Sequence, residues 1–329
     1  MLKKLSITLS FVALFCLFWY FQALRPVLST SVPDQDFEVR SGQGLDSIGQ
    51  SLSSQKLIRS RLAFKITVVR LGLTNKIQAG YFRLSPNMDI TAIAQKLTKA
   101  STKQVRVTLQ EGLRREEFAQ TIEQSLKSIN PQTNFSATDF VSKTKNLEGQ
   151  LFPDTYDLDP KVTTDQVVEK LHQRYLDIIS ELKIATDKQK SVTILASLVE
   201  REAGDSSEMS GVASVITNRL QSNWPTQIDA AIQYAVTSSR CRSLNCDWWP
   251  KSLTKADLQV RSAFNTYTNQ GLPPSPICNP GKDSLKAASE AKTGSYWFYL
   301  HDLNGQIHFA KTVEEHNQNV CRYLQKDCR

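Results

Sequence analysis

Apolar residues recur at helical spacing along most of the second half of the chain. The broadest apolar stripe lies in Ser191–Ala203 (SVTILASLVEREA), which predicts a helix with one face toward a core. The stripe ends in two carboxylates, Glu200 and Glu202, with Arg201 between them. On a helical wheel Glu202 falls near the centre of the stripe and Glu200 on its far edge. Periodicity therefore predicts that Glu202 is the more buried carboxylate, in a setting that raises a carboxyl pKa.

The pattern before this helix predicts a small α+β unit over Asp36–Leu109. The expected elements are a strand at Phe37–Val39, helices over Leu45–Ile58 and Arg61–Leu71, a strand over Ala79–Leu84, a helix over Asp89–Lys99 and a strand over Val105–Leu109. The strand–helix–helix–strand order, opened by G-x-G-L-D-S-I at Gly42–Ile48, resembles LysM-like peptidoglycan-binding modules. The motif is short, so a generic spacer domain is the alternative.

Helical periodicity also marks the rest of the chain. Further helices are expected over Glu111–Lys127, Phe135–Lys145, Thr163–Ile184, Glu208–Gln221, Ile228–Val236 and Ser284–Lys292. Between them, Leu147–Leu158 and Arg261–Gly281 are rich in Gly, Pro and polar residues and predict long ordered loops, which are commonly functional. Asn304-Gly305 predicts a hairpin, and a capping box at Thr312 starts a last helix.

A near-continuous apolar run occupies Leu5–Leu24. Its 20 residues match the hydrocarbon thickness of a bilayer, and no small-x-small cleavage site follows it. Lys3 and Lys4 precede the run and a lone Arg25 follows it, which favours a cytoplasmic N-terminus. We expect a single-pass membrane helix with the bulk of the chain outside the cytoplasm; an uncleaved signal peptide is the alternative.

Composition changes this picture little. The 329 residues are 40% hydrophobic and 22% charged, and the net charge of +8 suits an acidic polymer or an anionic surface. No dense Lys/Arg block occurs, so nucleic acid is not an expected partner.

The cysteine pattern favours disulfides over a metal site. The spacing of Cys241 and Cys246, and of Cys321 and Cys328, allows two local disulfides, and no zinc-ligand spacing is present. Five cysteines lie outside the apolar run, so at least one stays free or pairs elsewhere.

A series of short motifs follows the apolar run in one order. They are E-G at Glu111–Gly112, L-E-G-x-L-F-P-D-T-Y at Leu147–Tyr156, I-L-A-S-L-V-E-R-E at Ile194–Glu202, V-A-S-V-I-T-N-R-L at Val212–Leu220, Q-I-D at Gln227–Asp229, S-x-x-N-T-Y at Ser262–Tyr267, G-L-P-P-S-P-I-C-N-P-G at Gly271–Gly281, S-L-K-A-A at Ser284–Ala288, His308-Phe309 and E-H-N at Glu315–Asn317. Each motif alone is weak. In this order they resemble the endolytic murein transglycosylase family, also called MltG or YceG-like.

The resemblance implies an α+β fold in four parts. These are a membrane anchor over residues 1–24, a linker over 25–35, a LysM-like α+β domain over 36–109 and an α+β transglycosylase catalytic domain over 110–329. The implied localisation is the cytoplasmic membrane with the catalytic part extracytoplasmic. The implied partners are peptidoglycan glycan strands, the membrane, and cell-wall synthases or division proteins.

The resemblance also implies a lytic transglycosylase, which cleaves the β-1,4 bond between MurNAc and GlcNAc without water. One carboxylic acid protonates the leaving oxygen and then takes the proton of the sugar's own 6-hydroxyl, giving a 1,6-anhydro end. By resemblance this residue is the first Glu of V-E-x-E, Glu200, although the wheel points to Glu202. Both indications can hold if Glu200 faces a cleft and Glu202 has a structural role next to it.

A wider set of side chains is expected to bind the sugars. The set is Glu148, Tyr156, Asn218, Asp229, Gln233, Asn265, Tyr267 and His308. Amides would orient sugar or acetamido groups and tyrosines would stack on pyranose faces, while Glu148 and Asp229 are the other candidate carboxylates. No metal or cofactor is implied.

Two features depart from the family pattern. The chain reads Q-I-D-A-A around Asp229, where many members have Asp-Pro-Thr, and it carries a cysteine-bearing insert over Cys241–Trp249. Two other functions stay open: a non-enzymatic peptidoglycan tether, and a muramidase that uses Asp229 as a second carboxylate.

Overall fold

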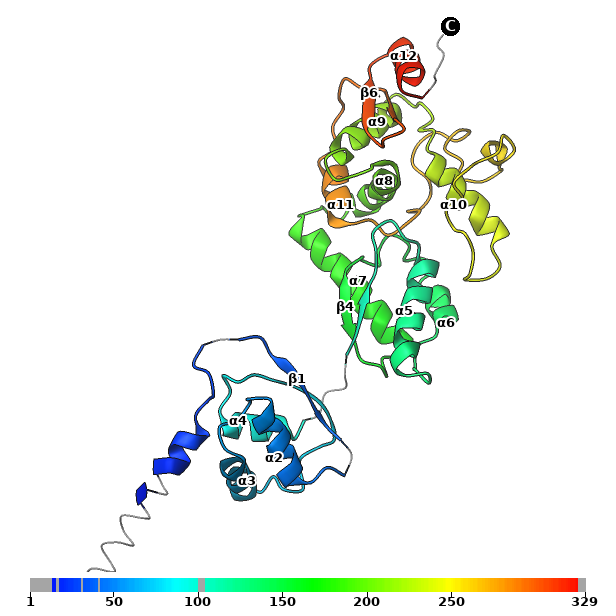
Figure 1. Cartoon of the computed structure of the whole chain (residues 1–329). Coiled ribbons are helices and arrows are strands. Elements are labelled where there is room, and N and C mark those ends of the chain that lie inside the picture. Colours follow the sequence, from blue (N-terminus) through cyan, green and yellow to red (C-terminus); the bar gives the residue numbers. More distant parts are fainter. Residues whose placement is uncertain (1–13, 16–17, 31, 41, 100–103, 325–329) are drawn as a thin grey trace, which may run out of the picture. The chain divides into compact units, whose positions relative to one another are not determined.

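The chain forms two compact units, Met1–Gln104 and Val105–Arg329. The computed structural model describes residues 14–15, 18–30, 32–40, 42–99 and 104–324 (Figure 1). The boundary expected after Leu109 differs from this division by five residues. The strand β3 (Val105–Thr108) belongs to the second unit, because it pairs there with β4 (Thr155–Leu158).

In the described part of the first unit, a two-stranded sheet packs against the helices α2, α3 and α4. Its elements are β1 (Gln35–Val39), α2 (Leu45–Ser54), α3 (Arg61–Arg70), β2 (Gly80–Leu84) and α4 (Ile90–Lys96). Phe37 of β1 lies opposite Phe82 of β2, and both are buried with Phe64 of α3. The expected strand–helix–helix–strand order is confirmed, whereas the LysM-like assignment stays a prediction.

Local chemistry sets the ends of these helices. The Ser60 hydroxyl accepts a hydrogen bond from the amide of Ala63 at the start of α3. The Asp89 carboxylate does the same for Ala92 at the start of α4. The helix α2 ends at Ser54 rather than at Ile58, and Lys56 follows in the left-handed region with φ of 56°.

The predicted fold class included a membrane helix over Leu5–Leu24, and this part of the prediction has to be corrected. Residues 5–13 and 16–17 of that run lie outside the described residues. Within the part of the chain that the structure describes, we find no helix with the length and apolarity needed to cross a membrane.

The described end of the apolar run contributes to the core of the first unit. Ala23 is buried, and Tyr20 and Leu24 pack against the same core. The Tyr20 hydroxyl lies 3.0 Å from the Thr67 hydroxyl. Apolar side chains that sequence alone assigns to lipid thus cover protein at this end.

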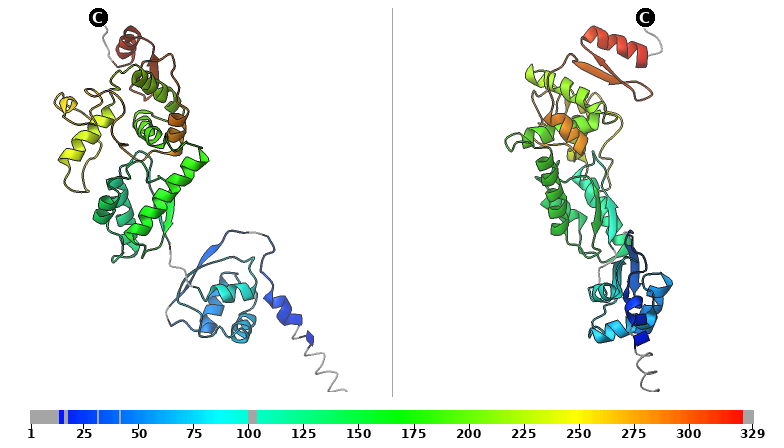
Figure 2. Two further views of the ribbon diagram at one scale, coloured as in Figure 1. Left: turned by 180° about the vertical axis from the view of Figure 1, so that it is seen from behind. Right: turned by 90° about the vertical axis from the view of Figure 1, so that its left-hand side faces the viewer.

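The second unit holds the remaining elements. They are β3, α5 (Arg115–Ile129), α6 (Ala137–Lys143), β4, α7 (Thr164–Glu181), α8 (Gln189–Glu202), α9 (Met209–Gln221), α10 (Asp229–Arg240), η1 (Asp257–Gln259), α11 (Lys282–Ser289), β5 (Phe298–His301), β6 (Ile307–Ala310) and α12 (Val313–Leu324). Within this unit, the β5–β6 hairpin and α12 lie at one end, while β3, β4, α5 and α6 lie at the other (Figure 2).

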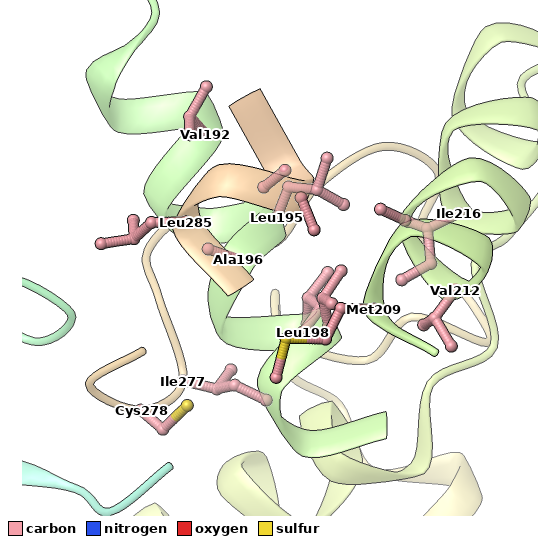
Figure 3. Close-up of a cluster of buried hydrophobic side chains, with 14 of the residues drawn as sticks. Val192, Leu195, Ala196, Leu198, Met209, Val212, Ile216, Ile277, Cys278 and Leu285 are labelled. Carbon is pink, nitrogen blue, oxygen red and sulfur yellow. The ribbon is translucent and has the colours of Figure 1, made fainter. Parts of the chain in front are cut away.

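Two hydrophobic clusters organise the second unit. One fills the space between the β3–β4 pair and the helices α5, α6 and α7. The other surrounds α8, whose buried residues contact side chains of α9 and α11 (Figure 3). The element over Ser191–Ala203 is therefore the central helix that its apolar stripe predicts.

The two predicted loops meet α8 and each other. The amide of Ile277 donates to the Ser197 hydroxyl at 3.1 Å, and the buried, free thiol of Cys278 lies 3.3 Å from the Ser197 carbonyl. The side-chain oxygen of Asn279 accepts from the amides of Gly149 and Leu151 at 2.9 and 3.2 Å. The segment Leu147–Leu158 differs from a pure loop, because its last four residues form β4.

Gly149 is expected to be a steric requirement of this loop contact. It has φ of +82°, and a Cβ there would lie 2.5 Å from the Pro276 side chain. Gly305 has the same φ and nothing within 4 Å. Gly305→Ala should cost about 1–2 kcal/mol from the left-handed backbone alone. Gly149→Ala should cost roughly 1–3 kcal/mol more, because the added methyl group overpacks the site. Urea unfolding of both variants checks this, and equal losses would contradict it.

Candidate active site

The last turn of α8 consists of charged residues that directly follow a buried stretch of the same helix. All residues from Val192 to Val199 are buried, whereas Glu200, Arg201 and Glu202 are half-buried. Successive residues on a helix point about 100° apart, so these three side chains leave the core in different directions. Each meets a different segment of the second unit.

The Glu200 side chain points to the start of α11. Its carboxylate accepts a hydrogen bond of 3.0 Å from the amide of Gly281, which caps that helix. The partial positive charge at a helix N-terminus stabilises a carboxylate in this position.

Glu111 is a second carboxylate beside Gly281. A Cβ on Gly281 would lie 2.1 Å from a Glu111 carboxylate oxygen, so the side chain rests against this glycine. Partial burial raises the pKa of Glu111, and the charges of Glu200 and Asp283 raise it further. The sequence motif E-G at Glu111–Gly112 therefore lies next to the start of α11.

Glu202 lies in a different environment, formed by α10 and the β5–β6 hairpin. The Tyr299 hydroxyl donates a hydrogen bond of 2.8 Å to its carboxylate. Burial raises the pKa of Glu202 to about 7, and the charge of Asp229 adds to the rise. The hydrogen bonds from Tyr299 and from the amide of Ala230 oppose it, as does His301. Glu202 is thus a carboxyl that exchanges its proton near neutral pH.

Asp229 and Tyr267 form a hydrogen-bonded pair next to this carboxyl. Asp229 is the first residue of α10 and is exposed, and the Tyr267 hydroxyl donates to it at 2.6 Å. Burial and the Asp229 charge raise the pKa of Tyr267, and Glu202 contributes to the same rise. The tyrosine therefore stays a hydrogen-bond donor between two carboxyl groups.

His301, whose charge acts on Glu202, is itself paired with Glu208. The His301 ring nitrogen Nε2 lies 3.0 Å from a Glu208 carboxylate oxygen, which also accepts from the amide of Gly204 at 2.7 Å. Sequence reasoning missed Tyr299, His301 and Glu208. The available signal was the strand Phe298–His301, whose alternation places Tyr299 and His301 on the same face.

The structure brings together only part of the predicted site. Glu202, Asp229 and Tyr267 lie in one cluster, whereas Glu200 points away from it, toward the start of α11. The other predicted binding residues bond mainly to protein. They are Glu148, Tyr156, Asn218, Gln233, Asn265 and His308.

Three of these residues are buried amides or a buried phenol. Asn218 donates to the carbonyls of Gly294 and Tyr296 at 2.9 and 2.7 Å, and Asn265 holds its own loop through two backbone carbonyls. The Tyr156 hydroxyl donates to the Phe152 carbonyl at 2.6 Å. These side chains are hydrogen-bonded to backbone carbonyls, which accounts for their burial without a sugar.

Gln233 and His308 are half-buried. The Gln233 amide donates to the Pro250 carbonyl at 2.9 Å. His308 lies in β6, with its ring 3.2 Å from an Asp302 carboxylate oxygen and stacked on Tyr323 at 3.6 Å.

Glu148 is a buried carboxyl at the loop contact. One oxygen accepts from the amide of Arg115 and from the side chain of Asn279, both at 3.1 Å, and the other oxygen has no partner among the described residues. Burial raises its pKa to about 8, with a further rise from Glu116 and an opposing effect of Arg114 and Arg115. An oxygen without a partner is compatible with the protonated form that this pKa predicts.

Comparison with known proteins gives a consistent set of similarities. A profile of the YceG-like family matches residues 37–322. A Bacillus subtilis (strain 168) protein named endolytic murein transglycosylase is 30% identical over 327 residues, which cover 92% of this chain and 88% of that protein.

Two further similarities are more distant. A Streptococcus pneumoniae (strain R6) protein of the same name is 24% identical over 343 residues; the match covers 92% of this chain and 60% of that longer protein. A crystal structure of a yceG-like protein from Listeria monocytogenes is 26% identical with a TM-score of 0.49, covering 88% of this chain and 99% of that one.

The raised pKa of Glu148 predicts a pH-dependent effect of Glu148→Gln. Between about pH 4.5 and 8 the folded state keeps a proton that the unfolded state releases, so this carboxyl lowers stability as pH rises. The amide cannot ionise. From pH 5.5 to 8.5 the stability of the variant relative to the original should therefore improve by on the order of 1–3 kcal/mol. Urea unfolding at both pH values measures this, and a constant difference would refute it.

Proposed function

The chain belongs to the YceG-like family, and on that premise we propose that it is an endolytic murein transglycosylase. Its substrate would be the glycan strand of peptidoglycan, cut at the β-1,4 bond between MurNAc and GlcNAc to leave a 1,6-anhydro end. The curated relatives that carry this name support the reaction class, and the chain covers most of the Bacillus relative. A role in the cell wall follows from the same proposal.

The proposal rests on the surroundings of Glu202. Its carboxylate accepts a hydrogen bond of 2.8 Å from the Tyr299 hydroxyl and lies beside the Asp229–Tyr267 pair, and burial raises its pKa to about 7. A group that first gives a proton and then takes one back works best when its pKa is near the working pH. Burial at the end of α8 supplies that property.

Glu202 is therefore better suited to act as the general acid and base than Glu200, which is the residue that the family resemblance suggests. The Glu200 carboxylate accepts a hydrogen bond of 3.0 Å from the amide of Gly281 at the start of α11. We propose that Glu200 holds the start of α11 against α8, and that Glu202 performs the proton transfers.

The reaction then needs a single carboxyl group. The Glu202 carboxylic acid gives its proton to the glycosidic oxygen as the bond from that oxygen to C1 of MurNAc breaks. The 6-hydroxyl oxygen of the same sugar attacks C1, and the Glu202 carboxylate takes the hydroxyl proton. No water is consumed, and the acid is regenerated. The nucleophile is intramolecular, so its high effective concentration replaces a second catalytic carboxylate.

The second candidate function is a muramidase, in which Asp229 would be the second catalytic carboxylate. Its carboxylate lies on the Glu202 side of the molecule and is ordered by the Tyr267 hydroxyl at 2.6 Å. A hydrolase would use such a carboxylate to activate water or to attack the sugar. That reaction would leave reducing MurNAc ends in place of anhydro ends.

The first unit supports a role in glycan binding. Its strand–helix–helix–strand order and the G-x-G-L-D-S-I segment at Gly42–Ile48 are the features that suggest a LysM-like module. If the whole protein were only a tether, it would bind peptidoglycan without changing it.

Replacing each glutamate separates these possibilities. Glu202→Gln should lower the formation of anhydro-MurNAc ends by about 10²–10⁴-fold, because the amide cannot donate the proton. The matched variant Glu200→Gln should retain far more activity. Mass spectrometry of digested peptidoglycan gives the measurement. Reducing ends from the unmodified protein would favour the muramidase, no product would favour the tether, and loss of activity only in Glu200→Gln would return the acid role to Glu200.

The pH profile tests the same assignment independently. A general acid must be protonated in the free enzyme, so kcat/KM should fall about tenfold per pH unit above about pH 7. The hydrogen bond from Tyr299 lowers the pKa of Glu202. Tyr299→Phe should therefore move this descending limb to higher pH. A limb that stays fixed, or moves down, would argue against Glu202 as the acid.

A further inference from the structure

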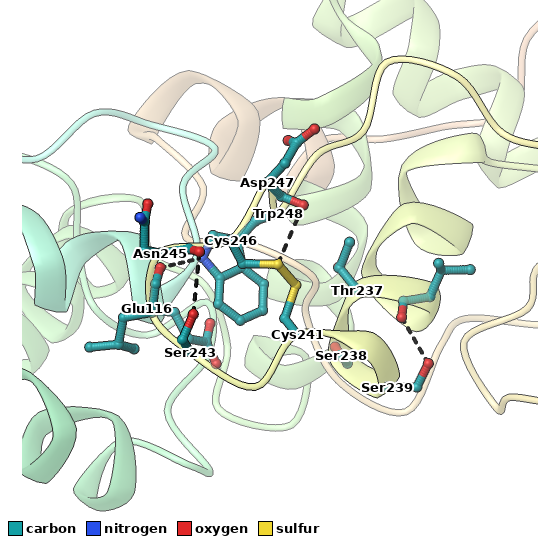
Figure 4. Close-up of a disulfide and its surroundings, with 12 residues drawn as sticks. Glu116, Thr237, Ser238, Ser239, Cys241, Ser243, Asn245, Cys246, Asp247 and Trp248 are labelled. Atoms are coloured by element: carbon teal, nitrogen blue, oxygen red, sulfur yellow. Dashed lines mark hydrogen bonds between the residues drawn. A yellow bond between two sulfur atoms is a disulfide. The ribbon is translucent and has the colours of Figure 1, made fainter.

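A disulfide closes the loop that follows α10. Cys241 caps the end of this helix and is bonded to Cys246. Figure 4 shows the disulfide with Trp248 beside it. The far end of the loop is tied back to α10, because the Gln233 side chain donates to the Pro250 carbonyl at 2.9 Å. We call the segment Cys241–Pro250 the disulfide loop.

Trp248 connects the disulfide loop to the start of α5. It is buried, and its ring lies 4.4 Å from the guanidinium of Arg114. The ring of Tyr234 lies on the same guanidinium at 4.2 Å. Arg114 is 2% exposed and is bonded to Glu116 and to hydroxyl groups of α10. The loop base is therefore fixed in the protein interior.

Trp249 reaches the last turn of α8. Its ring lies 3.9 Å from the guanidinium of Arg201, and its indole N–H donates to Glu117 at 2.9 Å. Few other contacts hold the Arg201 side chain in the described part of the chain. It donates to the Gly112 carbonyl at 3.3 Å, while its buried Nε has no hydrogen-bond partner in the described part of the chain. The face of Trp249 is thus a principal contact of this side chain.

We propose that Trp249 is a positioning residue that is held in place by the disulfide loop. Through its contact with Arg201 it fixes the last turn of α8 and so sets the orientation of the Glu202 carboxyl. The inference rests on the proposed function for its effect on the reaction. It assigns a role to the cysteine-bearing insert, which departs from the family pattern.

The physical reason is the position of Arg201 at a helix end. Terminal turns fray because their last carbonyls lack intrahelical partners. Arg201 lies between Glu200 and Glu202, so a tie on its side chain restrains both neighbours. A displacement of about 1 Å at a reacting group can cost about 10²-fold in rate. The loop therefore acts on catalysis without touching the substrate.

The first experiment is a double-mutant cycle on kcat. Trp249→Ala should lower kcat by about 10–100-fold with little change in KM, because the acid is misplaced while sugar binding persists. Trp249→Phe keeps an aromatic face for Arg201 and should restore most of kcat. Arg201→Gln should resemble Trp249→Ala, and combining the two should add little further loss. Additive losses, or full activity of Trp249→Ala, would overturn the proposal.

The second experiment needs no activity. Hydrogen–deuterium exchange of residues 199–203 should be faster in Trp249→Ala and in the double variant Cys241→Ser/Cys246→Ser, with α12 as the internal reference. Unchanged exchange in both variants would overturn the proposal. Uniformly faster exchange, α12 included, would do the same, because it would mean general destabilisation.

Failure of the proposed function is distinguishable from failure of this inference. If the unmodified protein forms no anhydro ends, the proposed function fails, and the exchange data still decide whether Trp249 orders the helix end. If it forms them and Trp249→Ala matches it, the positioning role fails and the proposed function stands.

Discussion

The second unit depends on how the helix α8 ends. Eight consecutive buried residues precede three charged ones, and an abrupt change of this kind is stable only if each charge finds a partner. Glu200 meets the start of α11, Arg201 meets Gly112 and Trp249, and Glu202 meets Tyr299. The helix end is the point where four segments distant in sequence must converge, and the chemistry of the site follows from that convergence.

Sequence periodicity predicted this core well. The stripe in Ser191–Ala203 gave the position of α8, and the helical wheel identified Glu202 as the carboxylate nearest the apolar face. The structure adds the physical consequence, a pKa of about 7 caused by burial. The motif resemblance points to Glu200, and the choice between the two carboxyls as the acid stays a prediction. Here the two lines of reasoning differed by two residues on one helix turn.

The rest of the site depended on contacts that local patterns cannot reveal. Asn279 lies 131 residues from Glu148, and their hydrogen bond makes a polar loop residue into a buried structural one. Asn218 likewise donates to backbone carbonyls of a distant segment, at Gly294 and Tyr296. A hydrophobic count also does not separate the environments at the end of the apolar run, where Ala23 is buried in the core of the first unit and Phe18 and Phe21 are exposed.

The free thiol of Cys278 has a consequence of its own. It is buried against the Ser197 carbonyl of α8, and burial raises its pKa well above the usual range for a thiol. The thiolate is the form that attacks an alkylating reagent, so this sulfur does not react while its loop is packed against α8. The rate at which Cys278 is alkylated would therefore measure local opening, because the thiol can react only when the proline-rich segment has moved away from the helix.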